Sequence, residues 1–305
     1  MLDWGLLFGR VLPAVATTIV LPAGQARAQS SAVEGQSIAA ATAGETKDKN
    51  VYNLFHPTPP DLMREFSTDR PDKTESPYTV DAGHFQWEMD FAVFTLERVD
   101  GAQSQIWNIA PVNIKVGLTN NTDLQLFFDS YIHERIEDHL ARAGKATDGV
   151  GDLTTRLKIN LWGDDGGMTA FAIMPFIKAP TNSHGLGNDA VEGGVIFPLA
   201  VALPGAWDMG LQTEVDFRRN ESNRGSHAEF INSVTFSHDI AGKLGGYVEF
   251  FSNVSTERGV SWVGTVDLGF TYAMAKNIQL DAGCNFGVTR PAADLQPFTG
   301  ISLRF

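Results

Sequence analysis

The chain has 305 residues, of which 36 are acidic and 23 basic, giving a formal net charge of −13. This acid surplus argues against nucleic acid as a partner, because no basic stripe is present to neutralise phosphates. The single cysteine, Cys284, cannot form an internal disulfide, so nothing in the fold depends on an oxidising compartment.

Residues 1–28 have the pattern of a cleaved export signal. Residues 11–21 form an apolar run, and Ala26, Arg27 and Ala28 make a small-x-small cleavage site ahead of Gln29. The run is too short to span a bilayer as a helix, which leaves a signal peptide or a buried core helix. We expect a signal peptide over residues 1–28. No later segment approaches roughly 18 consecutive apolar residues, so any membrane insertion must be by strands.

Residues 29–82 separate the expected signal from the first strand. Residues 29–49 are mostly small and polar, with little apolar surface to bury, and we expect a flexible leader there. Residues 66–80 carry charges that alternate in sign, and Pro71 and Pro77 rule out a helix. The charged side chains that could form a plug or a rim brace are Asp69, Arg70, Asp72, Lys73 and Glu75.

The stretch from Gly83 to Glu97 alternates apolar and polar residues with a period of two. Such a period predicts a strand with one apolar face and one wet face. The pattern recurs in segments of about 10 residues until the chain ends, joined alternately by tight turns and long polar loops, which is typical of a transmembrane antiparallel β-barrel. We therefore assign residues 83–305 to one all-β barrel.

About twelve strands can be counted, an even number that returns the chain to the side where it began. Residues 133–150 are expected to form a long polar loop between two of them. The strands are expected at about residues 83–97, 106–118, 123–132, 152–161, 169–178, 191–203, 207–218, 228–238, 246–253, 261–272, 278–288 and 297–305.

The polar face of these strands predicts a wet lumen. A soluble β-sandwich or a lipocalin-like barrel is the alternative, with the apolar faces turned inward. Twelve such strands would enclose a very wide apolar cavity, because barrel diameter grows with strand number, so lipid outside and water inside fit better. The candidate lumen-lining residues are Glu88, Asp90, Lys115, Asp129, Arg156, Lys158, Glu214, Asp216, Glu249, Asp267, Asp281 and Arg304.

Residues 68–77, which read Thr-Asp-Arg-Pro-Asp-Lys-Thr-Glu-Ser-Pro, are followed by Gly83 and a Gln86-x-Glu88 strand. This motif resembles the outer-membrane transporter family that is associated with the meta-pathway of phenol degradation. The resemblance covers about residues 66–305 and includes residues 151–158, 175–180, 280–281 and 300–305. It implies an outer-membrane location in a Gram-negative bacterium and the uptake of small hydrophobic or aromatic compounds.

No catalytic, metal or cofactor site is expected. The Ser-His pairs at 183–184, 226–227 and 237–238 consist of adjacent residues, which point to opposite faces of a strand and cannot form a dyad within it. Residues 133–139 contain two histidines and several acids, but their spacing fits no metal site and indicates a solvated loop.

A polar lumen of mixed charge predicts passive transport of small solutes. The alternative is a structural or envelope-interaction barrel with a closed lumen. The charged stretch before the first strand is expected to fold inward as a plug, with Arg70 paired to a lumenal carboxylate, although a solvated periplasmic linker remains open. The expected partners are outer-membrane lipid, small-molecule solutes and the barrel-assembly machinery, which would read the last strand ending in Phe305.

Overall fold

The computed structural model describes residues 48–305 except for residues 100, 221 and 223. The expected signal peptide, residues 1–28, and most of the expected leader lie outside the described residues. A short 3-10 helix, η2 (Lys49–Val51), comes first. No helix in the described part of the chain is long and apolar enough to cross a membrane.

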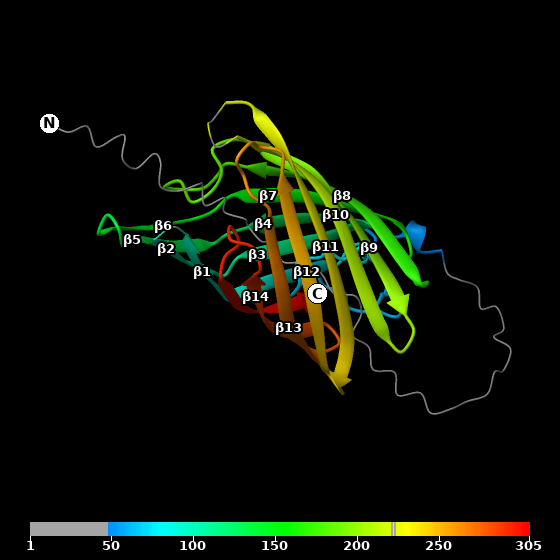
Figure 1. The fold of residues 1–305 in the computed structure, drawn as a ribbon. Helices are drawn as coiled ribbons and strands as arrows, with labels where there is room; N and C mark the ends of the chain where they lie inside the picture. The colour runs from blue at the N-terminus through cyan, green and yellow to red at the C-terminus, as the bar shows by residue number, and fades with distance from the viewer. Residues whose placement is uncertain (1–47, 100, 221, 223) are drawn as a thin grey trace.

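A single antiparallel sheet of fifteen segments follows, and pairing of its first and last segments closes it (Figure 1). The segments are β1 (Phe85–Val99), β2 (Ala102–Ile109), β3 (Val112–Thr119), β4 (Thr122–Phe128), β5 (Tyr131–Asp138), β6 (Ala143–Gly149), β7 (Leu153–Trp162), β8 (Thr169–Ala179), β9 (Glu192–Leu203), β10 (Trp207–Arg219), β11 (Ser226–Ala241), β12 (Leu244–Ser255), β13 (Val263–Ala275), β14 (Ile278–Gly287) and β15 (Leu295–Arg304).

Three barrel strands are each interrupted once, so the fifteen segments make twelve strands. Segments β2 and β3 are separated only by Ala110, whose φ is 54°, and Pro111, which has no N–H to donate to a ladder. The segments β4 and β5, and likewise β6 and β7, follow one another with similarly short breaks. The expected twelve-strand barrel is therefore confirmed.

The prediction of a polar loop over residues 133–150 was wrong. This region forms most of β5 and β6, which pair with each other and through β2 with β1. Figure 1 shows these three segments projecting beyond the rest of the barrel. Apolar–polar alternation marks strands that separate an apolar face from a polar one, and this hairpin extends past the closed part of the sheet (Figure 1). Backbone pairing and contacts such as that of His133 with Asp148 hold it. Its polar sequence therefore gave no alternating signal.

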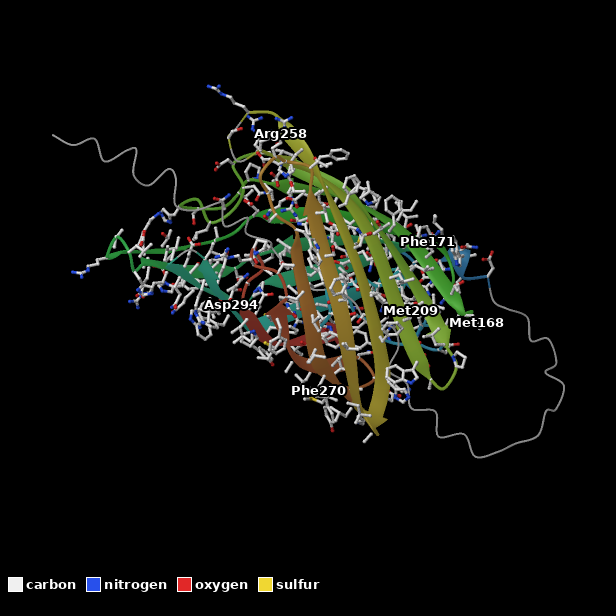
Figure 2. The ribbon with its side chains drawn as sticks, viewed as in Figure 1. Met168, Phe171, Met209, Arg258, Phe270 and Asp294 are labelled. Carbon is white, nitrogen blue, oxygen red and sulfur yellow. The ribbon has the colours of Figure 1, made fainter. Side chains whose placement is uncertain are left out.

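The two faces of the sheet differ in chemistry. Outward-facing Phe85 and Trp87 are half exposed, while Gln86 and Glu88 between them are buried. Figure 2 shows the same outward placement for Phe270 of β13. An apolar outer belt over a polar interior matches the alternation, because each residue of a strand points to the side opposite its neighbour.

The two ends of the barrel are unlike. At one end, the turn end, β3 and β4 are joined by residues 120–121, β11 and β12 by 242–243, and β13 and β14 by 276–277. The start of β1 and the end of β15 lie there too. At the other, the loop end, residues 180–191, 220–225, 256–262 and 288–294 form longer connections. Arg258 projects from one of these loops (Figure 2).

Candidate functional site

Residues 66–82, which we call the inner segment, lie inside the barrel. Every residue from Thr68 to Pro77 is buried, although five of these residues carry charges. The segment contacts strands on opposite sides of the barrel and leaves at the turn end. There Val80 donates its backbone N–H to Asp123 Oδ2 at 3.0 Å, and Ala82 forms a bridge with Gly117 of β3.

Asp69 of the inner segment contacts bases on β3 and β7. Its Oδ1 lies 2.6 Å from Lys158 Nζ, and its Oδ2 forms an ion pair with Lys115. The ammonium of Lys115 also lies 2.5 Å from Glu88 Oε1 of β1. The backbone N–H of Asp69 donates to the same Glu88 carboxylate. The fully buried carboxylate of Asp69 is therefore compensated by bases on two strands, β3 and β7.

Glu75 makes the second acid-to-base contact on this side of the lumen. Its Oε1 accepts from Arg156 Nη1 of β7 at 2.9 Å. Its backbone N–H donates to Gln212 Oε1 of β10 at 2.6 Å. The inner segment thus bridges β7 and β10, which are separated in the wall by β8 and β9.

Arg70 lies between two carboxylates and above an aromatic ring. Its Nη2 and Nε donate to the two oxygens of Asp281 of β14, at 2.6 and 3.1 Å, and its Nη1 lies 2.5 Å from Asp90 Oδ2 of β1. Its guanidinium carbon lies 5.9 Å from the ring centre of Phe298. A Cβ on Gly300 would come within 2.4 Å of Arg70 Nη2, so glycine leaves room for the guanidinium.

The side chain of Lys73 contacts groups on β12 and β13, next to the strand that carries Asp281. Its Nζ donates to Thr265 Oγ1 at 2.7 Å and lies 3.0 Å from Asp267 Oδ2, both on β13. The ammonium also lies 4.6 Å from the ring centre of Phe251 on β12. The backbone N–H of Lys73 donates to Glu249 Oε2 at 2.9 Å. Carboxylate, hydroxyl and aromatic face together surround one ammonium group.

Asp72, between these two cations in the sequence, is placed differently. Its side chain is buried, no base pairs with it among the described residues, and neither carboxylate oxygen has a well-aligned hydrogen-bond partner there, although the Thr235 side chain lies close enough to interact with it. The hydroxyl of Tyr247 and Oδ1 of Asp267 are likewise buried without such a partner within residues 48–305 as described. An uncompensated buried carboxylate is unfavourable, so this is the least satisfied point of the inner segment.

On β10 the predicted lumen residues form a cluster of their own. Asp216 lies directly opposite Glu229 of β11, and Arg218 contacts both, at 2.9 and 3.1 Å. Glu214, two residues before Asp216 on the same face of β10, accepts from Gln212 Nε2 at 2.8 Å. One arginine therefore offsets a pair of acids that face each other across two strands.

The remaining two predicted lumen residues lie toward the ends of the barrel. Asp129 is buried and accepts from Asn108 Nδ2 at 2.5 Å. Arg304 is only partly buried and contacts the backbone oxygen of Arg64 and the carboxylate of Asp81 at the turn end. Apart from Arg304, every residue of the predicted lumen set is buried.

Sequence reasoning missed several charged groups in the same interior. Asp123 is buried and lies directly opposite Lys158, and its place two residues before Gln125 was a usable signal. The alternation of residues 169–178 does place Lys178 in the lumen, where it forms an ion pair with Asp152 at 3.6 Å. Arg64 gave no signal, because it lies outside any alternating segment.

Arg64 belongs to a charged cluster that closes the turn end. Its Nε donates to Asp165 Oδ1 at 2.9 Å, and its Nη1 lies 3.4 Å from Asp164 Oδ2. Lys49 reaches Asp165 at 2.5 Å. Burial raises the pKa of Asp164 to about 6. Burial also opposes ionisation of Asp165, but hydrogen bonds from Arg64, Lys49 and Asn120 lower the pKa of that carboxyl well below its usual range.

The histidines considered as catalytic or metal-binding groups have other contacts. His184 Nδ1 contacts the backbone oxygen of Asp148, and His238 Nε2 contacts that of Gly205. His227 lies 3.3 Å from Glu229 Oε1. Over the described residues, no group of three or more histidine, cysteine or acidic side chains is arranged to hold a metal ion.

The family model described as "Putative MetA-pathway of phenol degradation" matches residues 68–305. No curated protein sequence matches the chain. An outer membrane channel from Pseudomonas putida F1 aligns with a TM-score of 0.51 at 12% identity, covering 73% of this chain and 94% of that one. This likeness shows the fold of an outer-membrane barrel.

Two further barrels align with lower scores. The translocator domain of the autotransporter NalP from Neisseria meningitidis gives a TM-score of 0.45 at 12% identity, over 73% of this chain and 88% of that one. The monoaromatic hydrocarbon channel CymD gives 0.41 at 9% identity, over 72% and 87%.

Proposed function

The chain belongs to the family described as "Putative MetA-pathway of phenol degradation", and from this premise we propose an outer-membrane channel for small hydrophobic or aromatic compounds. Transport is passive and the protein is not an enzyme. The proposed location is the outer membrane of a Gram-negative bacterium. Because such barrels have short periplasmic turns and longer extracellular loops, the turn end faces the periplasm.

The observation that carries this proposal is a polar interior inside an apolar outer face. Lipid-facing backbone must be fully paired, and the β1–β15 pairing closes the wall, while β6 in the projecting hairpin pairs with β5 on one side. A polar, charged interior allows water and small solutes to cross, whereas the apolar core of a lipid bilayer does not. The outer apolar belt makes outer-membrane lipid the surrounding partner.

We further propose that the inner segment acts as a plug. Apart from Asp72, its charges are compensated by groups on β1, β3, β7, β13 and β14 rather than by solvent. In this position it lies in the path of any solute crossing the lumen. The same contacts favour the second candidate function, a structural barrel whose lumen stays closed.

Conductance in a planar bilayer distinguishes the two functions. The full chain is expected to conduct weakly, deletion of residues 50–80 to raise single-channel conductance, and Arg70→Ala to raise it in part. Liposome swelling with phenol-like solutes should follow the same order. A deletion variant that inserts but conducts no better than the full chain would support the closed structural barrel.

Assembly is proposed to depend on the last strand. Phe305 exchanges backbone hydrogen bonds with Phe85, at 2.9 and 3.3 Å, and Leu303 lies opposite Trp87. Deleting residues 303–305 removes this closure and exposes unpaired backbone to lipid. The truncated chain should fail to reach the membrane as a heat-modifiable barrel, whereas Phe305→Tyr should insert normally.

A further inference from the structure

Three neighbouring strands of the lumen carry acids and no base. Strands β12, β13 and β14 contain no lysine or arginine, and their inner faces present Glu249, Asp267 and Asp281. Glu249 and Asp267 lie directly opposite each other across the β12–β13 ladder. Like charges in that position are destabilising, so this wall requires cations from outside its own strands. We call these three strands the acidic wall.

The inner segment supplies two cations to the acidic wall, each in a chemically distinct setting. Arg70 donates to both oxygens of Asp281 and faces Phe298, a geometry that suits a planar guanidinium. Lys73 meets one oxygen of Asp267, the hydroxyl of Thr265 and the ring of Phe251 in a compact arrangement that suits an ammonium.

The groups that contact Arg70 and Lys73 belong to the barrel wall and not to the inner segment. Asp281, Asp267, Thr265, Phe251 and Phe298 lie on β12 to β15, whose ladders are paired independently of the inner segment. When the inner segment leaves, the carboxylates and rings remain. They then form two vacant sites for cations.

We propose that the lumen wall holds two organic-cation sites, one for a guanidinium and one for a primary ammonium, which Arg70 and Lys73 occupy when the inner segment is in place. Soluble cations of the same chemistry bind there once the tethered ones are removed. The role of these sites in permeation rests on the proposed channel function, since solutes reach them only in an opened lumen.

On the opposite side of the lumen, Lys115 and Lys158 have acidic neighbours on the barrel strands themselves. Lys158 lies directly opposite Asp123, and Lys115 contacts Glu88, so these bases keep partners of their own without the inner segment. Arg156 of β7 is the exception, because its Nη1 pairs with Glu75 of the inner segment. The demand for external cations arises on the acidic wall, where Glu249 and Asp267 face each other without a base.

Chemical rescue of two full-length variants tests the sites. Arg70→Ala vacates the guanidinium site and Lys73→Ala vacates the ammonium site. Millimolar guanidinium should raise the unfolding midpoint of Arg70→Ala with a saturable concentration dependence and leave Lys73→Ala unchanged. Ethylammonium should do the reverse. The unsubstituted chain, whose sites are filled, should respond to neither, and tetramethylammonium at equal ionic strength should have no effect on any of the three.

If either variant fails to fold, the readout is the yield of heat-modifiable barrel on refolding with each cation. Equal rescue by tetramethylammonium, or no rescue by any cation, would overturn the proposal.

A second experiment uses the 50–80 deletion in a planar bilayer, where guanidinium and ethylammonium should reduce the potassium current. Asp281→Asn and Asp267→Asn should relieve that block separately. Rescue without any conductance of the deletion variant would refute the channel function and leave the sites intact.

Discussion

Two sides of the lumen hold the same inner segment with different charge patterns. On β4 and β7, Asp123 and Lys158 form a pair of opposite charge directly across the ladder. On β12 and β13, the corresponding positions are both acidic, Glu249 and Asp267. We call the side formed by β3, β4 and β7 the mixed wall. Apart from Arg156, which pairs with Glu75 of the inner segment, the mixed wall can compensate its own charges, whereas the acidic wall depends on cations that arrive with the inner segment.

This difference locates the contacts that keep the inner segment in the lumen. Removing Asp69 leaves Lys115 in contact with Glu88 and Lys158 opposite Asp123. Removing a base leaves two carboxylates near each other in a buried setting, which is strongly unfavourable. The stability of the closed state should therefore respond more to Arg70 and Lys73 than to Asp69, although all three are buried.

Arg70→Ala should have the largest effect. Asp90 and Asp281 would remain buried with no cation between them, and losing one partner of a buried charge cluster costs roughly 3–5 kcal/mol. The free energy of unfolding, measured by urea titration in phospholipid vesicles, should fall by that amount. Arg70→Lys is the matched control and should recover only part of it, because an ammonium cannot contact both oxygens of Asp281 as the guanidinium does.

Lys73→Met should come next. Glu249 and Asp267 would face each other without the ammonium, while the methionine keeps most of the apolar stem near Phe251. An unsatisfied buried charge of this kind costs about 1–3 kcal/mol. A loss equal to or below that of the mixed-wall substitution described next would contradict the ranking of the two walls.

Asp69→Asn should have a smaller effect, on the order of 1 kcal/mol. Lys115 keeps its contact with Glu88, and Lys158 keeps Asp123 opposite it. The asparagine can still accept one hydrogen bond where the carboxylate did. The same urea titration measures it, and a loss as large as that of Arg70→Ala would show that the mixed wall is not self-sufficient.

Asp72→Asn should have the smallest effect, and one of opposite sign. The carboxylate of Asp72 is buried with no base and no well-aligned hydrogen-bond partner among the described residues, and Glu249 is held close to it by the backbone of Lys73. Removing the charge while keeping the shape should stabilise the closed barrel by up to about 1 kcal/mol. Single-channel conductance should fall slightly, and a rise would mean that Asp72 helps to hold the segment in place.

Periodicity in the sequence was sufficient to predict the barrel and its strand number. The alternation of Arg156, Leu157 and Lys158 assigns a face to each side chain without any three-dimensional information. It failed at β5 and β6, whose sequences carry many charged and small residues and no regular apolar face. It also gave no reason to include Arg64 among the predicted lumen residues, because Arg64 lies outside the strands and alternation assigns a face only to strand residues.

The contacts of the inner segment lie beyond what such a pattern can specify. Arg70 and Asp281 are separated by 211 positions, and their contact depends on how the segment curves inside the closed sheet. Alternation indicates which carboxylates face the lumen but not their height or their neighbours. Gly300 shows the limit well, since its role is to leave a space that Arg70 fills.

A double-mutant cycle between Arg70 and Asp281 tests most directly whether the acidic wall holds the inner segment. Arg70→Met, Asp281→Asn and the double variant would be unfolded by urea in the same vesicles, with Asp69→Asn and Lys158→Met as the parallel cycle on the mixed wall. The account predicts a coupling energy of roughly 1.5–3 kcal/mol for Arg70 and Asp281, larger than that of the parallel cycle. A coupling near zero, or one exceeded by the mixed-wall pair, would contradict it.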